Sequence, residues 1–163
     1  MEIRLGRDSD IEEIIKILKE VIKTNNKYTK WNEDYPTKEI IMEDINSKCL
    51  YVMIKESHIV GVVTLNEKCD INYDKVQWSH KKKALVIHRL FISTKESGKG
   101  YGKELIKNII KIAEEKNYRQ IRLDTHEDNI VAQGLYEKCG FKAMGKISLE
   151  DVEGNFCVYE YNL

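Results

Sequence analysis

The first third of the chain combines one extended segment with two helical hydrophobic patterns. Apolar and polar side chains alternate over residues 2–5, which predicts a strand. Apolar residues then recur at helical spacing over residues 11–22, and a Ser-x-x-Glu sequence that begins at Ser9 predicts a capping box at the helix start. Thr37 is placed to cap a second, shorter helix over residues 40–45.

The middle of the chain contains three segments with the pattern of strands. Leu50–Lys55 and Ile59–Leu65 are separated by three residues, which is the length of a hairpin turn. Residues 66–83 are polar and irregular, which predicts a surface loop. The run Ala84–Ile92 is almost continuously apolar, as is typical of a strand that is covered on both faces.

The last third alternates helical and extended patterns. The predicted elements are a helix, a strand, a helix and two strands: Gly102–Lys116, Ile121–Thr125, Ile130–Cys139, Lys142–Leu149 and Phe156–Tyr161. The second of these helices ends at Gly140, because a residue that tolerates positive φ closes the final turn easily. This order of elements predicts an α/β fold with a mixed sheet flanked by helices. There is no repeat or linker, so we expect a single domain over residues 1–163.

Composition narrows the classes of protein without identifying one. Lys+Arg and Asp+Glu number 27 each, so the net charge gives no reason to expect a nucleic-acid or membrane partner. The N-terminus lacks the apolar core of a signal peptide, and we expect a soluble, cytoplasmic protein. The four cysteines are widely spaced without a C-x-x-C pair, which favours reduced thiols over a metal site or a redox dithiol, and we expect no metal.

A glycine-rich loop between the apolar strand and the following helix is the most informative segment. Its residues are Ser97, Gly98, Lys99, Gly100, Tyr101, Gly102 and Lys103. Glycines let the backbone turn tightly with its N–H groups exposed, and the helix start adds further free N–H groups and a positive dipole end. Such a loop predicts a seat for a phosphate or pyrophosphate. The alternative is a tight strand-to-helix turn without a ligand.

Two common nucleotide-binding motifs do not fit this loop. A P-loop requires Gly five positions before Gly102, where Ser97 stands, and Ser or Thr after Lys103, where Glu104 stands. The dinucleotide fingerprint G-x-G-x-x-G lacks its third glycine, because Lys103 or Leu105 occupies that position. The loop therefore predicts a phosphate ligand of another class.

The loop resembles the acetyl-CoA motif of the GNAT superfamily of N-acetyltransferases. That motif has Gln or Arg, two variable residues, Gly, one residue, and then Gly or Ala. Gly100 and Gly102 match it, whereas Ser97 stands where Gln or Arg is expected. This departure concerns one side-chain contact to the pyrophosphate and not the backbone cradle.

A second segment, Asp128–Phe141, resembles the N-x-x-A-x-x-L-Y-x-x-x-G-F pattern of the same superfamily. The resemblance implies a mixed, mostly antiparallel central sheet of about seven strands flanked by about four helices. It implies transfer of the acetyl group of acetyl-CoA to a primary amine of an unidentified small molecule or peptide, by direct attack in a ternary complex. The alternative is a non-catalytic acyl-CoA-binding regulatory module. We expect a monomer or a homodimer, since dimers are common among relatives.

The resemblance assigns roles to three residues of this second segment. Asn129 would contact the pantetheine arm, and Tyr136 would protonate the departing thiolate. The two residues are seven positions apart and so lie on nearly one helix face, with the small Ala132 between them. The alternative for Tyr136 is a core aromatic that packs beside Leu135.

The apolar strand supplies the remaining candidates for the chemistry. Its alternation places Val86, His88 and Leu90 on one face. His88 is the candidate general base or holder of a water molecule, because the attacking amine must lose a proton. The alternative is a core histidine held by hydrogen bonds. The resemblance places the donor for the oxyanion in the backbone of Leu90, Phe91 and Ile92.

The acceptor site is expected between the first two helices and near the last strands, as the resemblance implies. Trp31 and Tyr35 could form an aromatic wall, with Glu33 and Asp34 attracting a cationic amine. Asp124 is a weaker candidate for handling the amine. The alternative is that Trp31 and Tyr35 pack onto the core. A polyamine, an amino acid, an aminoglycoside and a protein amine all remain open as acceptors.

Overall fold

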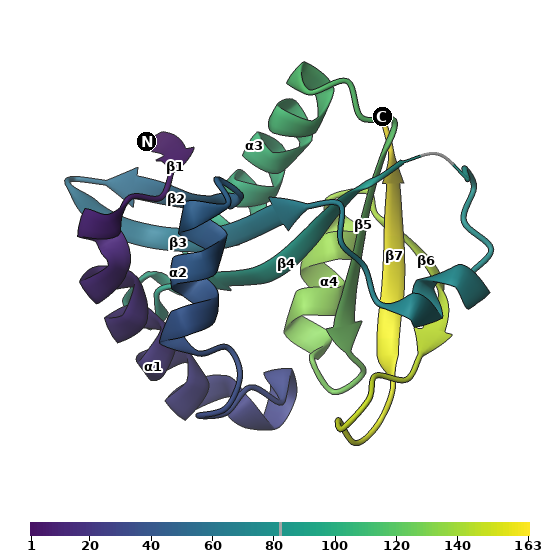
Figure 1. Ribbon diagram of the computed structural model, residues 1–163, viewed down its shortest axis with the longest axis horizontal. Helices are drawn as coiled ribbons and strands as arrows, with labels where there is room; N and C mark the ends of the chain where they lie inside the picture. The colour runs from purple at the N-terminus through teal and green to yellow at the C-terminus, as the bar shows by residue number, and fades with distance from the viewer. Residues whose placement is uncertain (82) are drawn as a thin grey trace.

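A seven-stranded sheet forms the centre of the structure, a computed structural model that describes residues 1–81 and 83–163 (Figure 1). The strands run in the order β1-β2-β3-β4-β5-β7-β6. Among the described residues, β4 and β5 form the only parallel pair, and the other neighbouring strands are antiparallel. The strands are β1 Glu2–Leu5, β2 Leu50–Lys55, β3 His58–Asn66, β4 Leu85–Ile92, β5 Gln120–His126, β6 Lys142–Ile147 and β7 Phe156–Asn162.

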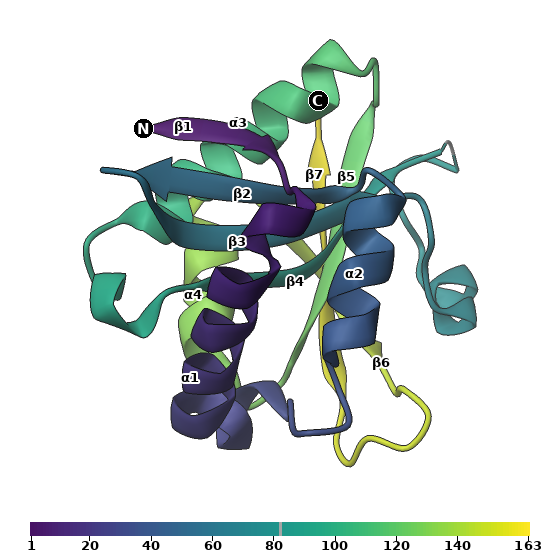
Figure 2. The ribbon, with the colours of Figure 1, turned by 60° about the vertical axis from the view of Figure 1, so that its left-hand side comes forward.

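Four α-helices cover the two faces of this sheet (Figure 2). They are α1 Ile11–Thr29, α2 Lys38–Asn46, α3 Tyr101–Glu115 and α4 Ile130–Lys138. Helices α1 and α2 bury their apolar sides in one cluster, which includes Val62 and Phe91 of the sheet. Helices α3 and α4 pack into a second cluster with Leu85 and Ile87. The expected mixed, mostly antiparallel sheet flanked by about four helices is confirmed.

The start of α1 differs from the prediction. The expected capping box from Ser9 to Glu12 is wrong, because a 3₁₀ turn at residues 8–10 precedes the helix and Asp10 is its N-cap residue. The Asp10 carboxylate accepts the backbone N–H of Arg7 at 2.8 Å and the guanidinium of Arg4 at 2.7 and 2.9 Å. These bonds lower the pKa of Asp10 and tie the helix start to β1.

A bulge interrupts β4 at the middle of the sheet. His88 pairs with Thr64 of β3, and Phe91 pairs with Val62, so two residues of β4 stand opposite one residue of β3. The first of the two, Arg89, has φ of 48°, which is uncommon for a residue with a side chain. The bulge removes a backbone group of β4 from the regular ladder.

The bulge also changes which face Leu90 occupies. Val86 packs against Phe156 and Val158 of β7, whereas Leu90 packs with the cluster of α3 and α4. The expectation that Val86 and Leu90 share a face is therefore wrong. A strand alternates strictly only while its pairing is regular, and the extra residue at Arg89 reverses the alternation beyond it.

Strands β4 and β5 lie side by side only at one end. Their parallel pairing joins three residue pairs, Leu85–Ile121 to Ile87–Leu123. Beyond these pairs β4 bonds only to β3, and β5 bonds only to β7. Figure 1 shows the two strands running apart from this point. The sheet is consequently split at its centre, and the split positions the candidate site.

Candidate active site

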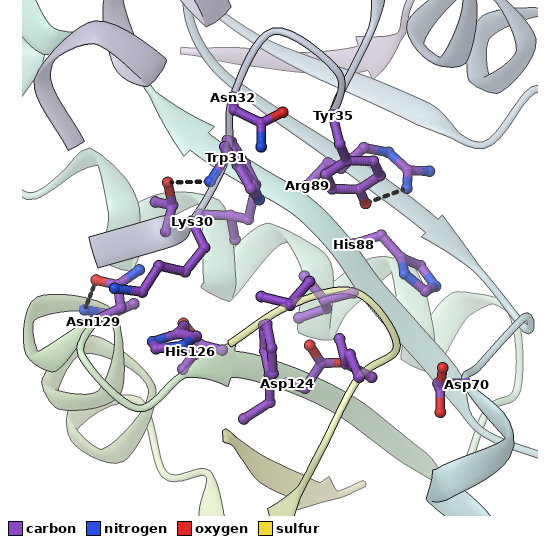
Figure 3. A pocket seen from close by; sticks show the side chains of 18 of the residues that line it. Lys30, Trp31, Asn32, Tyr35, Asp70, His88, Arg89, Asp124, His126 and Asn129 are labelled. Carbon is purple, nitrogen blue, oxygen red and sulfur yellow. Dashed lines mark hydrogen bonds between the residues drawn. The ribbon is translucent and has the colours of Figure 1, made fainter. Parts of the chain in front are cut away.

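A cavity of about 810 Å³ occupies the split between β4 and β5. Its walls come from both strands, from α4, from the segment that joins α1 to α2, and from the loop that joins β6 to β7 (Figure 3). The residues of the two strands that line it are Ile87, His88, Arg89, Leu90, Asp124, Thr125 and His126. Paired strands leave no room between them, so the divergence of β4 and β5 creates this space.

The glycine loop presents a row of free backbone N–H groups. Among the residues that the structure describes, no acceptor is found for the N–H groups of Gly98 to Lys103. Gly98 and Gly100 have φ of 77° and 83°, and a Cβ on either would meet no atom within 4 Å. Gly100 is the N-cap residue of α3, so the row ends at the positive end of a helix. The arrangement suits an anion with several oxygens, such as a pyrophosphate.

Gly102 has a packing role that the sequence does not reveal. A Cβ at this position would lie 3.1 Å from Leu135 Cδ2, and Leu135 lines the cavity. Gly102 therefore allows the first turn of α3 to lie against α4, beside the cavity wall. Two side chains of the loop have protein partners, because Lys99 pairs with Glu96 at 3.1 Å and the Tyr101 hydroxyl accepts the Lys55 ammonium at 2.7 Å.

Helix α4 brings three of the predicted residues to the cavity. The Asn129 side chain accepts the backbone N–H of Ala132 at 3.3 Å and caps the helix, and Tyr136 lies two turns further on. All three line the cavity. The ring of Tyr136 packs against Phe141 and Tyr159, at centroid distances of 5.8 and 6.0 Å.

Burial raises the pKa of Tyr136 well above its usual range, so its hydroxyl keeps its proton at neutral pH. No hydrogen bond joins this hydroxyl to any other described residue. The phenol is thus a protonated group beside the cavity, with its donor uncommitted to the protein.

His88 lines the cavity from β4, and a backbone carbonyl group of the β3–β4 connection holds its ring. Its Nε2 lies 2.9 Å from the carbonyl oxygen of Lys68, which can only accept, so the ring carries its hydrogen on Nε2. Burial, together with the nearby charge of Arg89, lowers the pKa of His88 to about 4. The imidazole is therefore neutral at neutral pH, and Nδ1 is its acceptor.

An ion pair holds the bulge of β4. The Arg89 guanidinium binds both carboxylate oxygens of Asp44 at 2.8 Å, and both side chains are mostly buried. The Asp44 carboxylate also accepts the Thr64 hydroxyl at 2.8 Å, and Arg89 donates to the Tyr35 hydroxyl at 3.1 Å. The pair connects α2, β3 and the α1–α2 segment to the one residue of β4 with positive φ. Because such backbone conformations persist only when neighbours hold them, the pair fixes the bulge.

Asp124 enters the cavity from β5. Its Oδ2 accepts the Tyr73 hydroxyl at 2.6 Å, and burial raises the pKa of this carboxyl group. Tyr73 is itself 2% exposed and packs against Trp78. Asp124 thus combines a fixed orientation with a basicity above that of an exposed aspartate.

The predicted acceptor residues divide between the cavity and the surface. Trp31 and Tyr35 line the cavity, as does Asp34, whereas Glu33 is exposed and is not among the lining residues. Trp31 meets Phe91 edge to face with centroids 6.0 Å apart. Figure 3 shows Trp31, Tyr35 and Arg89 on one side of the cavity, with Asp124 and His126 opposite.

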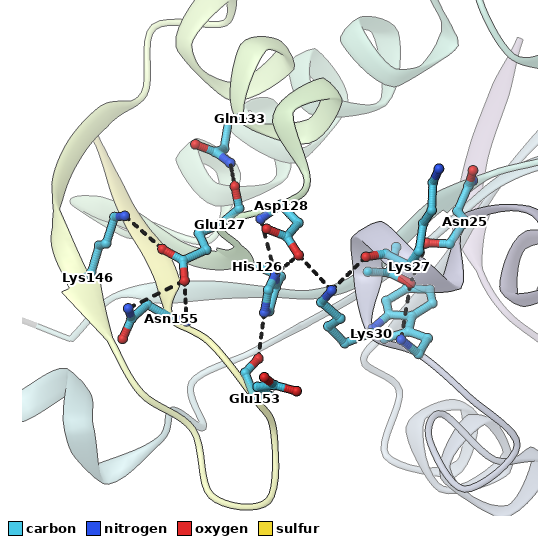
Figure 4. Close-up of polar contacts among 12 residues, drawn as sticks. Asn25, Lys27, Lys30, His126, Glu127, Asp128, Gln133, Lys146, Glu153 and Asn155 are labelled. Carbon is cyan, nitrogen blue, oxygen red and sulfur yellow. Dashed lines mark hydrogen bonds and ion pairs between the residues drawn. The ribbon is translucent and has the colours of Figure 1, made fainter.

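A polar network joins the loops at one end of the cavity (Figure 4). His126 Nε2 lies 2.7 Å from the carbonyl oxygen of Glu153, and its Nδ1 accepts the backbone N–H of Asp128 at 3.1 Å. Asp128 also pairs with Lys30 at 2.6 Å. Three loops that are distant in sequence are therefore tied together around the cavity mouth.

Several site residues escaped the sequence analysis, although the sequence contains a signal for some of them. Arg89 is a charged residue inside an apolar strand, and Asp44 stands on the apolar side of α2 between Ile41 and Ile45. A charge in an apolar pattern indicates a buried partner. No such signal marks the lining role of the β6–β7 loop, because that role depends on how the loop folds back.

In the part of the chain that the structure describes, no cluster of three or more His, Cys, Asp or Glu is arranged to hold a metal ion. No described helix combines the length and the hydropathy needed to span a membrane.

Comparison with known proteins gives one family. A family model described as "Acetyltransferase (GNAT) family" matches residues 16–141. N-acetyltransferase 8B of Homo sapiens is 28% identical over 98 residues, which are 60% of this chain and 40% of that protein. N-acetylaspartate synthetase of Xenopus tropicalis is 26% identical over 106 residues, which are 65% of this chain and 35% of that protein. The chain thus spans less than half of the length of these two relatives.

A solved structure agrees on the fold. The acetyltransferase of the GNAT family from Streptococcus agalactiae superposes with a TM-score of 0.87 over 99% of this chain and 95% of that one, at 24% identity. The likeness covers the whole arrangement of sheet and helices.

Proposed function

The chain belongs to the acetyltransferase (GNAT) family, and we propose that it transfers the acetyl group of acetyl-CoA to an amine. The observation that carries the proposal is the split between β4 and β5 together with the free N–H groups of residues 98–103. The first provides room for a thioester arm, and the second provides a seat for a diphosphate. Acetyl-CoA supplies an activated acyl group, and the protein has to bind it and manage two protons.

The chain's own residues fit such a cosubstrate along one path. The backbone of Gly98 to Lys103 would hold the diphosphate, and the side of α4 that contains Asn129 and Ala132 would flank the pantetheine arm. Ala132 is small, so the arm could pass close to the helix. Ser97 offers no long side chain to the phosphates, which leaves the backbone as the main contact.

In the proposed reaction the amine nitrogen bonds to the acetyl carbon while the bond from that carbon to sulfur breaks. Tyr136 supplies the proton that the departing thiolate needs, since its hydroxyl is protonated and uncommitted. The amine's proton passes to His88 or Asp124, directly or through a water molecule. His88 offers Nδ1 as an acceptor, and Asp124 offers a carboxylate whose pKa is raised by burial.

The bulge of β4 supports the same chemistry. It turns a backbone group of the segment Arg89–Leu90 away from the β3 ladder, at the edge of the cavity. A backbone N–H in such a place can stabilise negative charge that develops on the thioester oxygen. Arg89 and Asp44 act here as positioning residues, because they hold the bulge through their ion pair.

The acceptor is an amine of a small molecule or a peptide. The names of relatives offer different candidates, since one group is named N-acetylaspartate synthetase and a structural neighbour from Brucella melitensis is named ribosomal-protein-alanine N-acetyltransferase. The first name makes an acidic amino acid one candidate acceptor for this chain, and the second makes a protein amine another.

The test has two stages on the purified chain. Calorimetric titration with acetyl-CoA measures binding, and thiol release from acetyl-CoA in the presence of pooled amines measures transfer. We expect binding without an amine and thiol release only with one. Binding without release from any amine would favour a regulatory acyl-CoA-binding module, and the absence of binding would contradict the proposal altogether.

A further inference from the structure

The cavity is lined by carboxylates that lack cationic partners. Among the described residues, none of these six forms an ion pair within 4.0 Å with Lys, Arg or His: Asp34, Asp70, Asp124, Glu150, Asp151 and Glu153. Unpaired carboxylates also occur elsewhere among the described residues, as at Glu33 and Glu114. The distinctive feature is that these six line one cavity.

Among the described residues, the two permanent cations that line the cavity are both neutralised by carboxylates that do not line it. Lys30 pairs with Asp128 at 2.6 Å, and Arg89 binds Asp44 through two nitrogens. Neither Asp44 nor Asp128 lines the cavity. The charge that faces the interior is consequently negative, and nothing in the described wall compensates it.

The carboxylate of Asp124 has one oxygen that is free to bind a ligand. Tyr73 binds only Oδ2, and no described residue donates to Oδ1. No described side-chain oxygen is both enclosed and without a partner, so Oδ1 is open to the cavity. A recessed carboxylate with one oxygen fixed and the other facing an internal space is arranged to receive a donor from a ligand.

Four of the carboxylates belong to two separate parts of the cavity wall, a strand of the sheet and a loop. Asp124 lies on β5 at the centre of the sheet, whereas Glu150, Asp151 and Glu153 lie on the β6–β7 loop. That loop is fixed over the cavity, because the carbonyl oxygen of Glu153 accepts from His126 at the end of β5. A ligand that pairs both with Asp124 and with the carboxylates of the β6–β7 loop needs two positive charges.

From this arrangement we infer that the acceptor is a diamine or polyamine. One amine approaches Asp124 and is acetylated, and a second cationic group pairs with the carboxylates of the β6–β7 loop. This inference rests on the proposed acetyl transfer. Opposite charges in a partly enclosed cavity attract each other more strongly than at an exposed surface, and an acceptor with its own carboxylates is repelled.

The experiment first compares two acceptors that differ by one terminal amine. Cadaverine and pentylamine have the same five-carbon chain, but only cadaverine carries a second amine. We expect kcat/KM for cadaverine to exceed that for pentylamine at least about tenfold, which corresponds to about 1.4 kcal/mol for one partly shielded ion pair. Spermidine should resemble cadaverine, and aspartate should be the poorest acceptor. The ratio of cadaverine to pentylamine should fall as salt is added.

Variants locate the preference on the loop. The double substitution Glu150→Gln and Glu153→Gln should reduce the ratio of cadaverine to pentylamine to about threefold or less. The double substitution Glu114→Gln and Glu115→Gln, at exposed residues of α3, removes the same two charges outside the cavity and should leave the ratio intact. A ratio that is equally reduced by this control would show a general effect of net charge and would overturn the assignment.

The outcome is separable from that of the proposed function. If pentylamine or aspartate is acetylated as efficiently as cadaverine, acetyl transfer stands and the inference about the acceptor fails. If no amine is acetylated, calorimetric titration of cadaverine and pentylamine into the CoA-saturated protein still decides the inference. Preferential binding of cadaverine would support it, and equal binding of the two would refute it.

Discussion

The ion pair between Arg89 and Asp44 gives the sharpest prediction, because it separates stability from catalysis. Both side chains are mostly buried, and two hydrogen bonds of 2.8 Å join them. Substitution Arg89→Leu leaves the Asp44 carboxylate with two neutral partners, the Thr64 hydroxyl and the Cys49 thiol. Breaking one side of such a buried pair costs about 3–5 kcal/mol of folding stability.

Replacing both partners should remove part of that loss. In the double variant Arg89→Leu with Asp44→Leu no charge remains at this site, so no carboxylate is buried without its cationic partner. The Thr64 hydroxyl loses its acceptor, which costs about 1–3 kcal/mol. We therefore expect the double variant to be more stable than Arg89→Leu alone and within about 3 kcal/mol of the unaltered protein.

Catalysis should not recover in the double variant. Without the guanidinium clamp the bulge at residue 89 loses the contacts that hold its positive φ, and the backbone N–H near it loses its position. Displacement of such a group costs about a hundredfold in kcat. Urea denaturation and thiol-release kinetics on both variants test this. If kcat returns to normal when both residues are leucine, the pair acts only through stability and our account of the bulge is refuted.

Three further outcomes follow from single side chains. Tyr136→Phe should lower kcat by about 10²–10⁴ with little change in melting temperature. Tyr159→Phe changes the neighbouring ring in the same way and should leave kcat unchanged. Equal kinetics for the two variants would show that Tyr136 is not the acid. Gly102→Val should lower the free energy of unfolding, measured by urea denaturation, by about 1–3 kcal/mol, because its Cβ would meet Leu135 at 3.1 Å. An unchanged unfolding midpoint would contradict this packing. The pKa of His88 falls from 6.5 to about 4 on folding, so its contribution to stability is complete above pH 6.5 and declines as the pH falls toward 4, by up to about 3 kcal/mol. His88→Gln should flatten this part of the stability profile, and an unchanged profile would show that His88 is not buried in this way.

The sequence predicts the order of elements well, because the signals for helices and strands are local. Helix α3 shows this most clearly, since Leu105, Ile106 and Ile109 are fully buried as its periodicity requires. The exposed lysines at 103 and 107 lie on its other side. The Thr37 cap is present too, with the backbone N–H of Ile40 as donor at 3.3 Å.

Departures from the predictions occur where contacts are distant in sequence. The Ser9 cap is absent because Asp10 pairs with Arg4 of the neighbouring strand, a contact that no local pattern specifies. The face of Leu90 depends on a bulge, which is stabilised by Asp44 from 45 residues earlier in the chain. Sequence periodicity contains neither contact.

The residues of the candidate site also differ in how far the sequence predicts them. The residues of the two motifs, such as Asn129 and Tyr136, could be named from spacing because one helix positions them. The sequence gives only a weak signal for a role of Asp124, because the residue that orients its carboxylate, Tyr73, lies 51 positions away in the chain. The resemblance implies an acceptor site near the last strands, but it does not single out the carboxylates of the β6–β7 loop, whose relation to the cavity follows from the loop's attachment to His126.

We propose that the backbone N–H groups of residues 98–103, which have no acceptor in the described protein, hold the diphosphate of coenzyme A. Amide NMR of the isotope-labelled protein during titration with coenzyme A observes these groups individually. The account predicts saturable shifts that are largest for Gly98, Gly100 and Gly102, with smaller changes along α4. Coenzyme A that leaves these amides unshifted, or that fails to bind the folded protein, would contradict it.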